Sequence, residues 1–219
     1  VTANVYPENA TIKDVVWASA NESIATVDED GEIFAIGTGK VKITATSQDG
    51  NNIKGVCWVY VTPVINISSL RINSKDIYML SGRSRKLSVI VRPAVNTDSY
   101  AWYSSDTGIV TVDENGVITT VGPGTAEVYV ISNNAGVEST CTVHSLAISR
   151  SNLTLEQYDR YTLDVIGTDS NITWRSSNPR VCTVSSSGEI IGRKAGTATI
   201  TATVNDKTLS CVVRVTSIR

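Results

Sequence analysis

The chain has few of the residues that enzyme chemistry uses. Its 219 residues include one histidine, one methionine, one phenylalanine and four cysteines. A Ser-His-Asp or Cys-His arrangement needs a histidine beside its nucleophile, and the single His144 offers no second base. No Cys/His cluster has zinc-ligand spacing, and no glycine-rich loop follows a strand and opens a helix, as phosphate binding requires. The sequence therefore predicts a protein that is not an enzyme and needs no metal or cofactor.

Charge of one sign and long hydrophobic runs are also lacking. The 19 basic and 21 acidic residues are interspersed and leave a formal net charge of −2, which disfavours nucleic acid and anionic membranes as partners. No apolar run approaches the roughly 20 residues of a transmembrane helix, and no signal peptide is present. We therefore expect no membrane insertion, and we expect this segment to be part of a larger chain that supplies targeting and anchoring.

What the sequence does contain is a repeat. Three stretches, 17–45, 102–130 and 174–204, each begin with a tryptophan, which is followed 14 positions later by one glycine and 8 positions after that by another. The tryptophans are Trp17, Trp102 and Trp174, the first glycines are Gly31, Gly116 and Gly188, and the second are Gly39, Gly124 and Gly196. Two fixed spacings held three times indicate a tandem array of one small unit.

Short segments in which apolar and polar residues alternate lie between these landmarks, for example VKITATS (41–47) and TATITATV (197–204). Val, Ile and Thr dominate them, which favours strands, and no helical spacing persists for three turns. Turn signals about every ten residues are typical of a β-sandwich. The sequence thus predicts an all-β fold of three tandem sandwiches in an elongated array. The expected domains, called repeats 1, 2 and 3, are 1–64, 65–144 and 145–219.

The repeated tryptophans and turn glycines have both a structural and a functional interpretation. Tryptophans can be sugar-stacking platforms, but a tryptophan early in a sandwich domain usually packs on the core, and we expect that role for Trp17, Trp102 and Trp174. The turns at Asp28 and Asp113 place a glycine where φ is positive. Their acids also suggest calcium, but the third copy has serines at 185–187 and keeps its glycine. We therefore expect conserved turn geometry and no metal site.

Repeat 1 starts later in the pattern than the other two repeats. Aligning Pro7 with Pro93 places Val1 opposite Leu87, so repeat 1 lacks the stretch from Leu70 to Leu87 that supplies a first strand in repeat 2. Two explanations stay open at this point. Either the stretch lies outside this fragment, or another chain or segment supplies the strand by edge addition.

The two junctions between repeats differ in length. From Cys57 to Leu70 there are 13 positions, but from Cys141 to Leu146 only 5. The last strand of repeat 2 should therefore run directly into repeat 3, with His144 as a junction contact. We predict a stiff second joint, a looser first joint and a rod-like chain. Small-angle scattering that gave a compact envelope would contradict the rod.

The stretch from Trp174 to Ala202, W-x-S-S-N-P-x-V-x-T-V-x-x-x-G-x-I-x-G-x-x-x-G-T-A-T-I-T-A, resembles the bacterial immunoglobulin-like group 2 (BIG2) domain. The resemblance covers nearly the whole chain, as one truncated and two complete copies. Thr107-Gly108 stands where Asn178-Pro179 does, and Cys182 where Ala25 does. The resemblance implies an Ig-like β-sandwich of bacterial surface and secreted proteins, including adhesins, and of phage proteins and extracellular glycosidases. It does not identify a ligand.

Candidate ligand-binding residues are aromatic. In 57–61 the period of two places Trp58 and Tyr60 on the outer face of a strand, and no other repeat has aromatic residues at both equivalent positions. The pair would cover the start of repeat 2, stack on a sugar or meet a protein partner. A weaker candidate is the pair Tyr100 and Tyr103, which flanks Trp102.

The four cysteines allow two redox states of repeat 3, with free thiols or with one disulfide. Cys57, Cys141 and Cys211 occupy one late position in each repeat, where a small buried hydrophobe is the simplest role. Cys182 shares an inward face with Val184, so a disulfide between Cys182 and Cys211 is the alternative to two free thiols in repeat 3. Such a bridge would close a loop of about 30 residues and contribute on the order of 3–4 kcal/mol.

These observations support three hypotheses about function. The first is a spacer or adhesion module of a bacterial cell-surface or secreted protein. The second is a carbohydrate-binding accessory region of an extracellular glycosidase, and the third is a phage or virion decoration module. In each of the first two the location is extracellular, and the partner is a host protein or an extracellular glycan.

Overall fold

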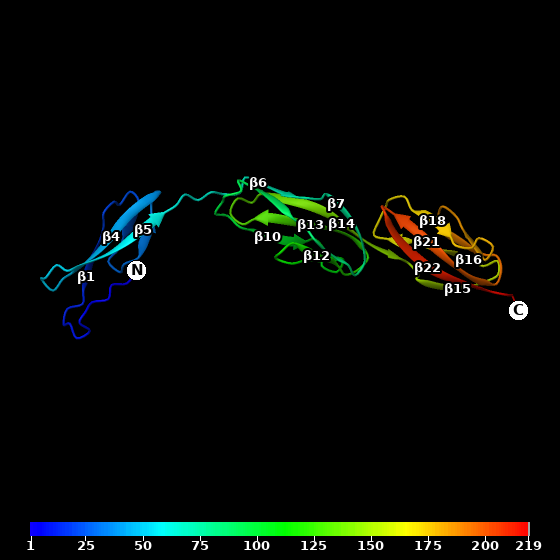
Figure 1. The fold of residues 1–219 in the computed structure, drawn as a ribbon, viewed down its shortest axis with the longest axis horizontal. Coiled ribbons are helices and arrows are strands. Elements are labelled where there is room, and N and C mark those ends of the chain that lie inside the picture. Colours follow the sequence, from blue (N-terminus) through cyan, green and yellow to red (C-terminus); the bar gives the residue numbers. More distant parts are fainter. Residues whose placement is uncertain (219) are drawn as a thin grey trace. The chain divides into compact units, whose positions relative to one another are not determined.

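The computed structural model describes residues 1–218, and every regular element in that range is a strand (Figure 1). The chain divides into two compact units, Val1–Val64 and a second unit that begins at Ile65. The first unit holds repeat 1, and the second holds repeats 2 and 3. No helix in residues 1–218 has the length and hydropathy needed to cross a membrane. The all-β class expected from the sequence is confirmed.

Repeat 1 has five strands and a small core. They are β1 (Val15–Ser19), β2 (Ala25–Val27), β3 (Ile33–Ala35), β4 (Gly39–Ser47) and β5 (Lys54–Val61). β4 lies between β1 and β5 in one antiparallel sheet, and β2 and β3 form a hairpin. Ala25, Val41 and Ile43 are buried, and Trp17 packs against them.

Repeat 2 is a complete sandwich. Its strands are β6 (Ser69–Ile72), β7 (Asp76–Leu80), β8 (Ser84–Lys86), β9 (Val89–Arg92), β10 (Tyr100–Ser104), β11 (Val110–Val112), β12 (Val117–Thr120), β13 (Gly124–Ser132) and β14 (Glu138–Ile148). One sheet contains β10, β13 and β14, with β7 added parallel to β14, and the other contains β11, β12 and β8. A cluster that includes Ile77, Leu87, Ile118 and Val128 fills the space between the sheets.

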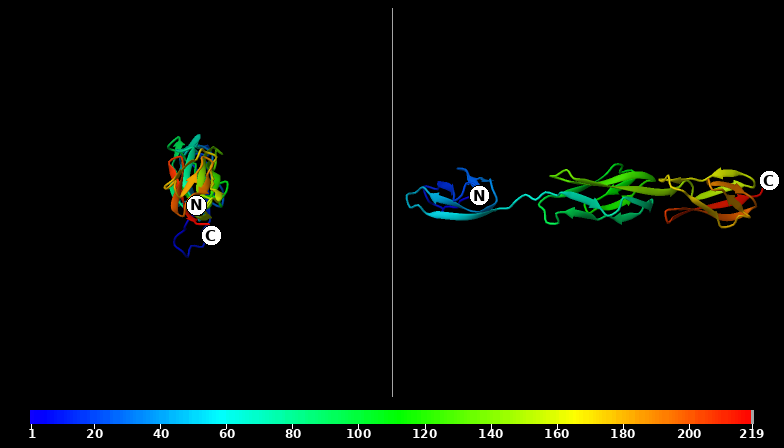
Figure 2. Two further views of the ribbon diagram at one scale, coloured as in Figure 1. Left: turned by 90° about the vertical axis from the view of Figure 1, so that its right-hand side faces the viewer. Right: turned by 90° about the horizontal axis from the view of Figure 1, so that it is seen from above.

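Repeat 3 has the same arrangement. Its strands are β15 (Asn152–Glu156), β16 (Arg160–Thr162), β17 (Val165–Ile166), β18 (Thr173–Ser176), β19 (Cys182–Val184), β20 (Glu189–Gly192), β21 (Gly196–Val204) and β22 (Lys207–Thr216). One sheet has the order β15-β22-β21-β18 and the other β16-β20-β19. Leu163, Ile190, Ile200 and Val213 are buried between them. Within each of repeats 2 and 3 the two sheets face each other (Figure 2).

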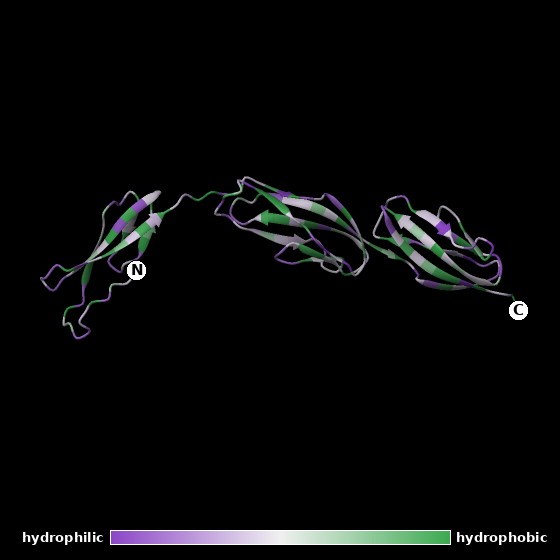
Figure 3. Cartoon of the chain, in the orientation of Figure 1, coloured by the Kyte–Doolittle hydropathy of each residue, from purple (hydrophilic) through white to green (hydrophobic). Residues whose placement is uncertain are grey.

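Alternation along the strands is what separates the core from the surface. In β21 the alanine, isoleucine and valine side chains at even positions are buried, whereas the intervening threonines are exposed or half-buried. Figure 3 shows the resulting bands of hydrophobic and hydrophilic residues along the strands. Because side chains on a strand alternate between its two faces, one apolar face per sheet suffices to enclose each core.

The spacing of 14 between tryptophan and glycine has a steric cause. Gly116 has φ of +75° after the β11–β12 turn, and a Cβ added there would lie 2.7 Å from Cζ2 of Trp102. Gly31 and Gly188 also have positive φ and lie against Trp17 and Trp174. The glycine therefore allows both the left-handed backbone and the close approach of the indole ring. In each repeat the hairpin turn therefore packs against the tryptophan ring.

The joint between repeats 2 and 3 is continuous. β14 runs from repeat 2 into repeat 3, where Ala147 and Ile148 pair with β17 (Figure 1). Leu146 is 1% exposed and lies in a cluster with residues of β17, β21 and β22, against which Tyr78 and Leu80 of repeat 2 also pack. The expectation that the last strand of repeat 2 runs directly into repeat 3 is confirmed.

The stretch that repeat 1 lacks differs from the sequence expectation in one respect. We expected it to supply one strand, but in repeat 2 it forms three: β6 pairs with β9, β7 pairs with β14 and β8 pairs with β12. The alignment of Val1 with Leu87 is confirmed by their contacts. The amino group of Val1 donates a hydrogen bond to Gly31 O (2.8 Å), as Leu87 N does to Gly116 O (2.8 Å).

Candidate functional site

The most exposed aromatic pair on a strand lies on β5. Trp58 is 52% exposed and Tyr60 is 65% exposed, and both point away from the core of repeat 1, as the period of two predicts. Lys40 on the neighbouring strand β4 lies directly across from Tyr60. Its Nζ is 4.2 Å from the ring centroid of Trp58 and 5.1 Å from that of Tyr60. Both distances are within the range of a cation–π contact.

The same face carries the positive charge of the strands in repeat 1. Lys42 lies across from Trp58, and Lys54 is on the same outer face of β5. Val56 is 61% exposed in the same row of β5. We call the outer face formed by Lys40, Lys42, Val56, Trp58 and Tyr60 the aromatic–lysine face. Its chemistry suits a ligand with an apolar ring face and a negative or polar rim.

The second aromatic candidate, Tyr100 with Tyr103, does not form one platform. The two residues are three positions apart on β10 and therefore lie on opposite faces of the strand. Tyr103 instead lies opposite Tyr129 on β13 and stacks on it, with ring centroids 5.5 Å apart. Tyr129 was not among the sequence candidates, because its proximity depends on the register between β10 and β13.

The tryptophans of the repeat pack against the cores. Trp17, Trp102 and Trp174 are each half-buried against the buried cluster of their own repeat. Trp174 also contacts the cluster at the joint with repeat 2. In these positions one edge of the indole faces the turn glycine and the ring packs against the core.

His144 lies at the joint and is part of its packing. Its ring stacks on Tyr78, with centroids 4.2 Å apart and an interplanar angle of 7°. Its Nδ1 donates to Gly167 O in repeat 3 (3.2 Å). The Tyr78 hydroxyl forms a hydrogen bond of 3.1 Å with Ser170 Oγ. The pair formed by Tyr78 and His144 thus links repeat 2 to repeat 3 through polar contacts as well.

The aspartate side chains of the acidic turns accept hydrogen bonds from backbone amides of the same turn. Asp28 Oδ1 accepts hydrogen bonds from the amides of Asp30 (3.1 Å) and Glu32 (2.7 Å). Asp113 accepts from two amides in the same way, and Ser185 Oγ does so in repeat 3. Within residues 1–218 no three His, Cys, Asp or Glu side chains gather as a metal site would need. Carboxylate and hydroxyl serve here as alternative turn caps.

The cysteines are free thiols in the structure. Cys141, Cys182 and Cys211 are buried, and Cys57 is half-buried. Cys182 and Cys211 lie in one cluster of repeat 3, but the disulfide considered from the sequence is not formed. Burial raises the pKa of Cys141 to about 11 and also raises the pKa values of Cys182 and Cys211. Thiols in such surroundings behave as small hydrophobes.

Alkylation of the native protein tests this assignment. Without reductant we expect Cys57 to react at least about tenfold faster than the three buried cysteines at mildly alkaline pH, because the thiolate is the reactive form. The rate at Cys141 should keep rising with pH until about 11, where its thiol ionises. In denaturant all four cysteines should be alkylated, as counted by intact mass. A mass that shows only two reactive cysteines would mean that the disulfide exists.

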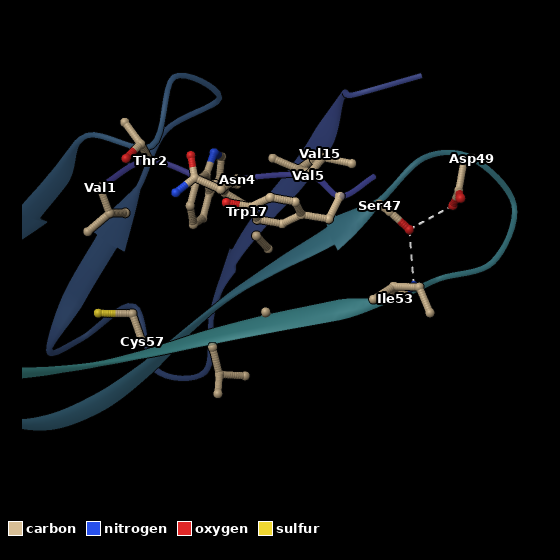
Figure 4. A pocket seen from close by; sticks show the side chains of 15 residues that line it. Val1, Thr2, Asn4, Val5, Val15, Trp17, Ser47, Asp49, Ile53 and Cys57 are labelled. Atoms are coloured by element: carbon tan, nitrogen blue, oxygen red, sulfur yellow. Dashed lines mark hydrogen bonds between the residues drawn. The ribbon is translucent and has the colours of Figure 1, made fainter. Parts of the chain in front are cut away.

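A cavity lies inside repeat 1, beside the sheet. It has a volume of about 310 Å³ and is bounded by the segment 1–6 and the strands β1, β4 and β5 (Figure 4). Trp17, Ala45 and Cys57 line it from the sheet, and Val1 and Val5 line it from the N-terminal segment. Its lining is mixed: apolar side chains lie beside Ser47, whose Oγ donates a hydrogen bond to Asp49 Oδ1 (2.7 Å).

Comparison with known proteins agrees with the repeat structure. The family model "Bacterial Ig-like domain (group 2)" matches residues 1–56, 67–143 and 142–213. An uncharacterised protein of Clostridium acetobutylicum is 34% identical over 146 residues, which are 66% of this chain and 15% of that protein. Ice-binding protein 1 of Shewanella frigidimarina is 26% identical over 92% of this chain and 24% of its own length. This chain thus spans a quarter or less of these two relatives.

Among solved structures, domains 1–6 of the surface layer protein SbsC align with 94% of this chain and 35% of their own length, at 19% identity and a TM-score of 0.32. The family match covers all three repeats and most of the residues in each. The strands, the turn glycines and the packed tryptophans repeat in the same three segments. The chain belongs to the bacterial Ig-like domain (group 2) family.

Proposed function

We propose that the chain is a non-catalytic spacer segment of a bacterial surface or secreted protein, which holds another part of that protein at a distance. The observation that carries this proposal is the joint between repeats 2 and 3. One strand, β14, belongs to both repeats, and Leu146 is buried in a cluster to which both contribute. A joint of this kind resists bending, because a bend would expose apolar surface and break backbone hydrogen bonds.

The orientation of repeats 2 and 3 in solution tests the spacer function. Residual dipolar couplings of the full chain should fit one alignment tensor for both repeats. Leu146→Ala should loosen the joint and give two different tensors. Leu163→Ala is the matched control, since Leu163 is equally buried at 1% exposed but lies in the cluster of repeat 3 alone. Separate tensors for the two repeats in the wild type would overturn the stiff spacer.

A second candidate function, glycan or host-protein recognition, is supported by the aromatic–lysine face. Trp58 and Tyr60 are exposed and held by Lys40, and exposed aromatic side chains of this kind supply contact energy at binding sites. In repeats 2 and 3 the positions equivalent to Trp58 and Tyr60 are Thr142 and His144, and Val212 and Arg214. Recognition would therefore belong to repeat 1 alone.

Binding arrays of glycans and host-matrix proteins test this second function. We expect a ligand of the aromatic–lysine face to lose at least about tenfold in affinity for Trp58→Ala/Tyr60→Ala, because large exposed anchors dominate such contacts. Phe34→Ala is the matched control, since Phe34 is a 47% exposed aromatic residue of the same repeat on another strand, β3. A hit that survives the double substitution, or no hit at all from folded protein, would contradict recognition by this face.

A further inference from the structure

The aromatic–lysine face of repeat 1 has a regular order across two strands. On β5, Trp58 and Tyr60 are two residues apart, which is about 7 Å along a strand. On the neighbouring strand β4, Lys42 lies directly across from Trp58. Lys40 lies across from Tyr60 in the same way. A row of two aromatic residues therefore lies beside a row of two lysines, and β4 and β5 alone build this arrangement.

No acidic side chain balances the charge of this sheet face. The outer-face positions of β1, β4 and β5 hold three lysines and no Asp or Glu. They are Val16, Ala18, Lys40, Lys42, Thr44, Thr46, Lys54, Val56, Trp58 and Tyr60. The ion pairs formed within residues 1–218 join other residues and leave the three lysines without a carboxylate partner. Their ammonium groups are therefore available to an anionic ligand.

The positive charge belongs to repeat 1 and is not required by the fold. The strand registers place Glu127 of repeat 2 at the position of Lys42, and Glu138 at the position of Lys54. In repeat 3 both equivalent residues are threonines. Three sandwiches with the same strands thus have positive, negative and neutral side chains at these two positions. Because the fold accepts all three, the lysines are best explained by what the face binds.

We propose that the aromatic–lysine face binds an acidic polysaccharide, a linear chain of sugar units that carries carboxylate or sulfate groups. This inference rests on the second candidate function and names the class of its ligand. The C–H face of a sugar ring packs on an aromatic ring, and anionic substituents form charge-assisted hydrogen bonds with lysine. Lys40 Nζ is within cation–π distance of both rings, so an anion paired with it lies beside the aromatic surface.

Two aromatic–lysine pairs in one row favour a polymer over a single sugar. A ligand that uses both pairs needs at least two units, with its charges along one side. Proteins that bind single-stranded nucleic acid also combine aromatic rings with positive charge, but along a groove. This chain has a net charge of −2 and three lysines on an open sheet face, which is little attraction for a ligand with one phosphate per nucleotide. The polysaccharide is therefore the favoured ligand.

Matched anionic and neutral saccharides test the proposal on the full chain. One anionic probe is oligogalacturonate, which carries carboxylates, and its neutral counterpart is the methyl ester of the same oligomer. The other anionic probe is dextran sulfate, and its neutral counterpart is dextran. An oligo(dT) of similar length is the nucleic-acid probe. Affinities are measured by isothermal titration calorimetry at two salt concentrations.

Three double variants separate the contributions of charge and rings. Lys40→Ala/Lys42→Ala removes the lysines that lie across from the rings, and Trp58→Ala/Tyr60→Ala removes the rings themselves. All four side chains are exposed. The matched control replaces two exposed lysines of repeats 2 and 3 by alanine and so changes the net charge of the chain by the same amount: Lys86→Ala/Lys194→Ala.

We expect at least one anionic probe to bind at least about tenfold more tightly than its neutral counterpart, because hydrogen bonds to charged groups are the stronger ones. Both variants of the face should lose at least about tenfold in affinity, and the control less than about twofold. Binding should weaken as salt rises, because the charges are exposed to solvent.

Equal affinity for charged and neutral saccharides would overturn the acidic class and leave glycan recognition by the rings in place. Full binding by Lys40→Ala/Lys42→Ala would have the same meaning. Equal losses in the control would show attraction by net charge and overturn the site, as would binding that Trp58→Ala/Tyr60→Ala leaves unchanged. Tighter binding of oligo(dT) than of either saccharide would assign the face to nucleic acid. If folded protein bound none of the probes, this inference would fail, and the host-protein arm of the binding arrays would decide separately whether the face recognises a protein.

Discussion

Trp174→Ala should unfold repeat 3 at temperatures where the wild type is folded, at a cost of about 3–5 kcal/mol. Trp174 packs against two buried clusters, one in the core of repeat 3 and one at the joint with repeat 2. Removing the indole would leave a cavity between the two clusters. The backbones of β18 and β21 are held by their antiparallel pairing and cannot move in to fill it. Because small domains are stable by only about 5–15 kcal/mol, a loss of this size takes most of the margin of a domain at the lower end of that range.

The measurement is the set of backbone amide NMR signals, followed during denaturant titration, because Trp174 is the one tryptophan of repeat 3 and its replacement removes any indole signal there. The amides of β21 report on repeat 3, and those of β13 and β4 report on the other repeats within the same sample. In Trp174→Phe the loss should be smaller, because a ring remains over the core. Trp58→Ala is the surface control and should cost less than about 1 kcal/mol, the value of an exposed cation–π contact. An unchanged denaturant midpoint of repeat 3 in Trp174→Ala would mean that the ring does not support the core.

Sequence reasoning located most strands because their signal is local. In 197–204 the alternation of aliphatic residues with threonine identifies both the strand and its inward face, and β21 follows it. The hairpins can be predicted for the same reason, since the turn residues at 28–31 and 113–116 lie between the strands they join. Period and turn chemistry need no knowledge of distant parts of the chain.

What the sequence could not provide was pairing between distant segments. β6 is only four residues long and pairs with β9, and β7 adds in parallel to β14, some 66 residues away (76 to 142). Parallel pairing leaves no turn signature, so the stretch before Leu87 was read as one strand. For the same reason the sequence placed His144 at a junction but did not find its stacking partner Tyr78, which lies opposite it in the β7–β14 register.

The candidate site also combines features that a local sequence pattern predicts with features that depend on strand register. The outward direction of Trp58 and Tyr60 followed from the period of two, and the structure places both rings at the surface. The position of Lys40 over these rings depends on the register between β4 and β5, which no local pattern specifies. The weaker candidates Tyr100 and Tyr103 are three positions apart on β10, which puts their side chains on opposite faces of the strand.

Gly116→Ala should destabilise repeat 2 by about 2–5 kcal/mol for two separable reasons. An alanine at φ of +75° carries the penalty of a left-handed backbone, roughly 1–2 kcal/mol. Its Cβ would also lie 2.7 Å from Cζ2 and 2.9 Å from Cε2 of Trp102, so the indole must shift away from the core. Forced displacement of a packed side chain costs a further ~1–3 kcal/mol.

Gly82→Ala separates the two contributions in the same repeat. Gly82 has φ of +78°, and a Cβ added there meets nothing within 4 Å. Both substitutions stiffen the unfolded chain equally, so the difference between their free energies of unfolding measures the contact with the tryptophan alone. We expect Gly116→Ala to be the more destabilising by about 1–3 kcal/mol in denaturant titrations. Trp102→Phe should narrow that difference, because a smaller ring leaves space for the methyl group. Equal effects of the two glycine substitutions would show that the fixed spacing of 14 in each repeat serves only the turn, and that the tryptophan is held by other contacts.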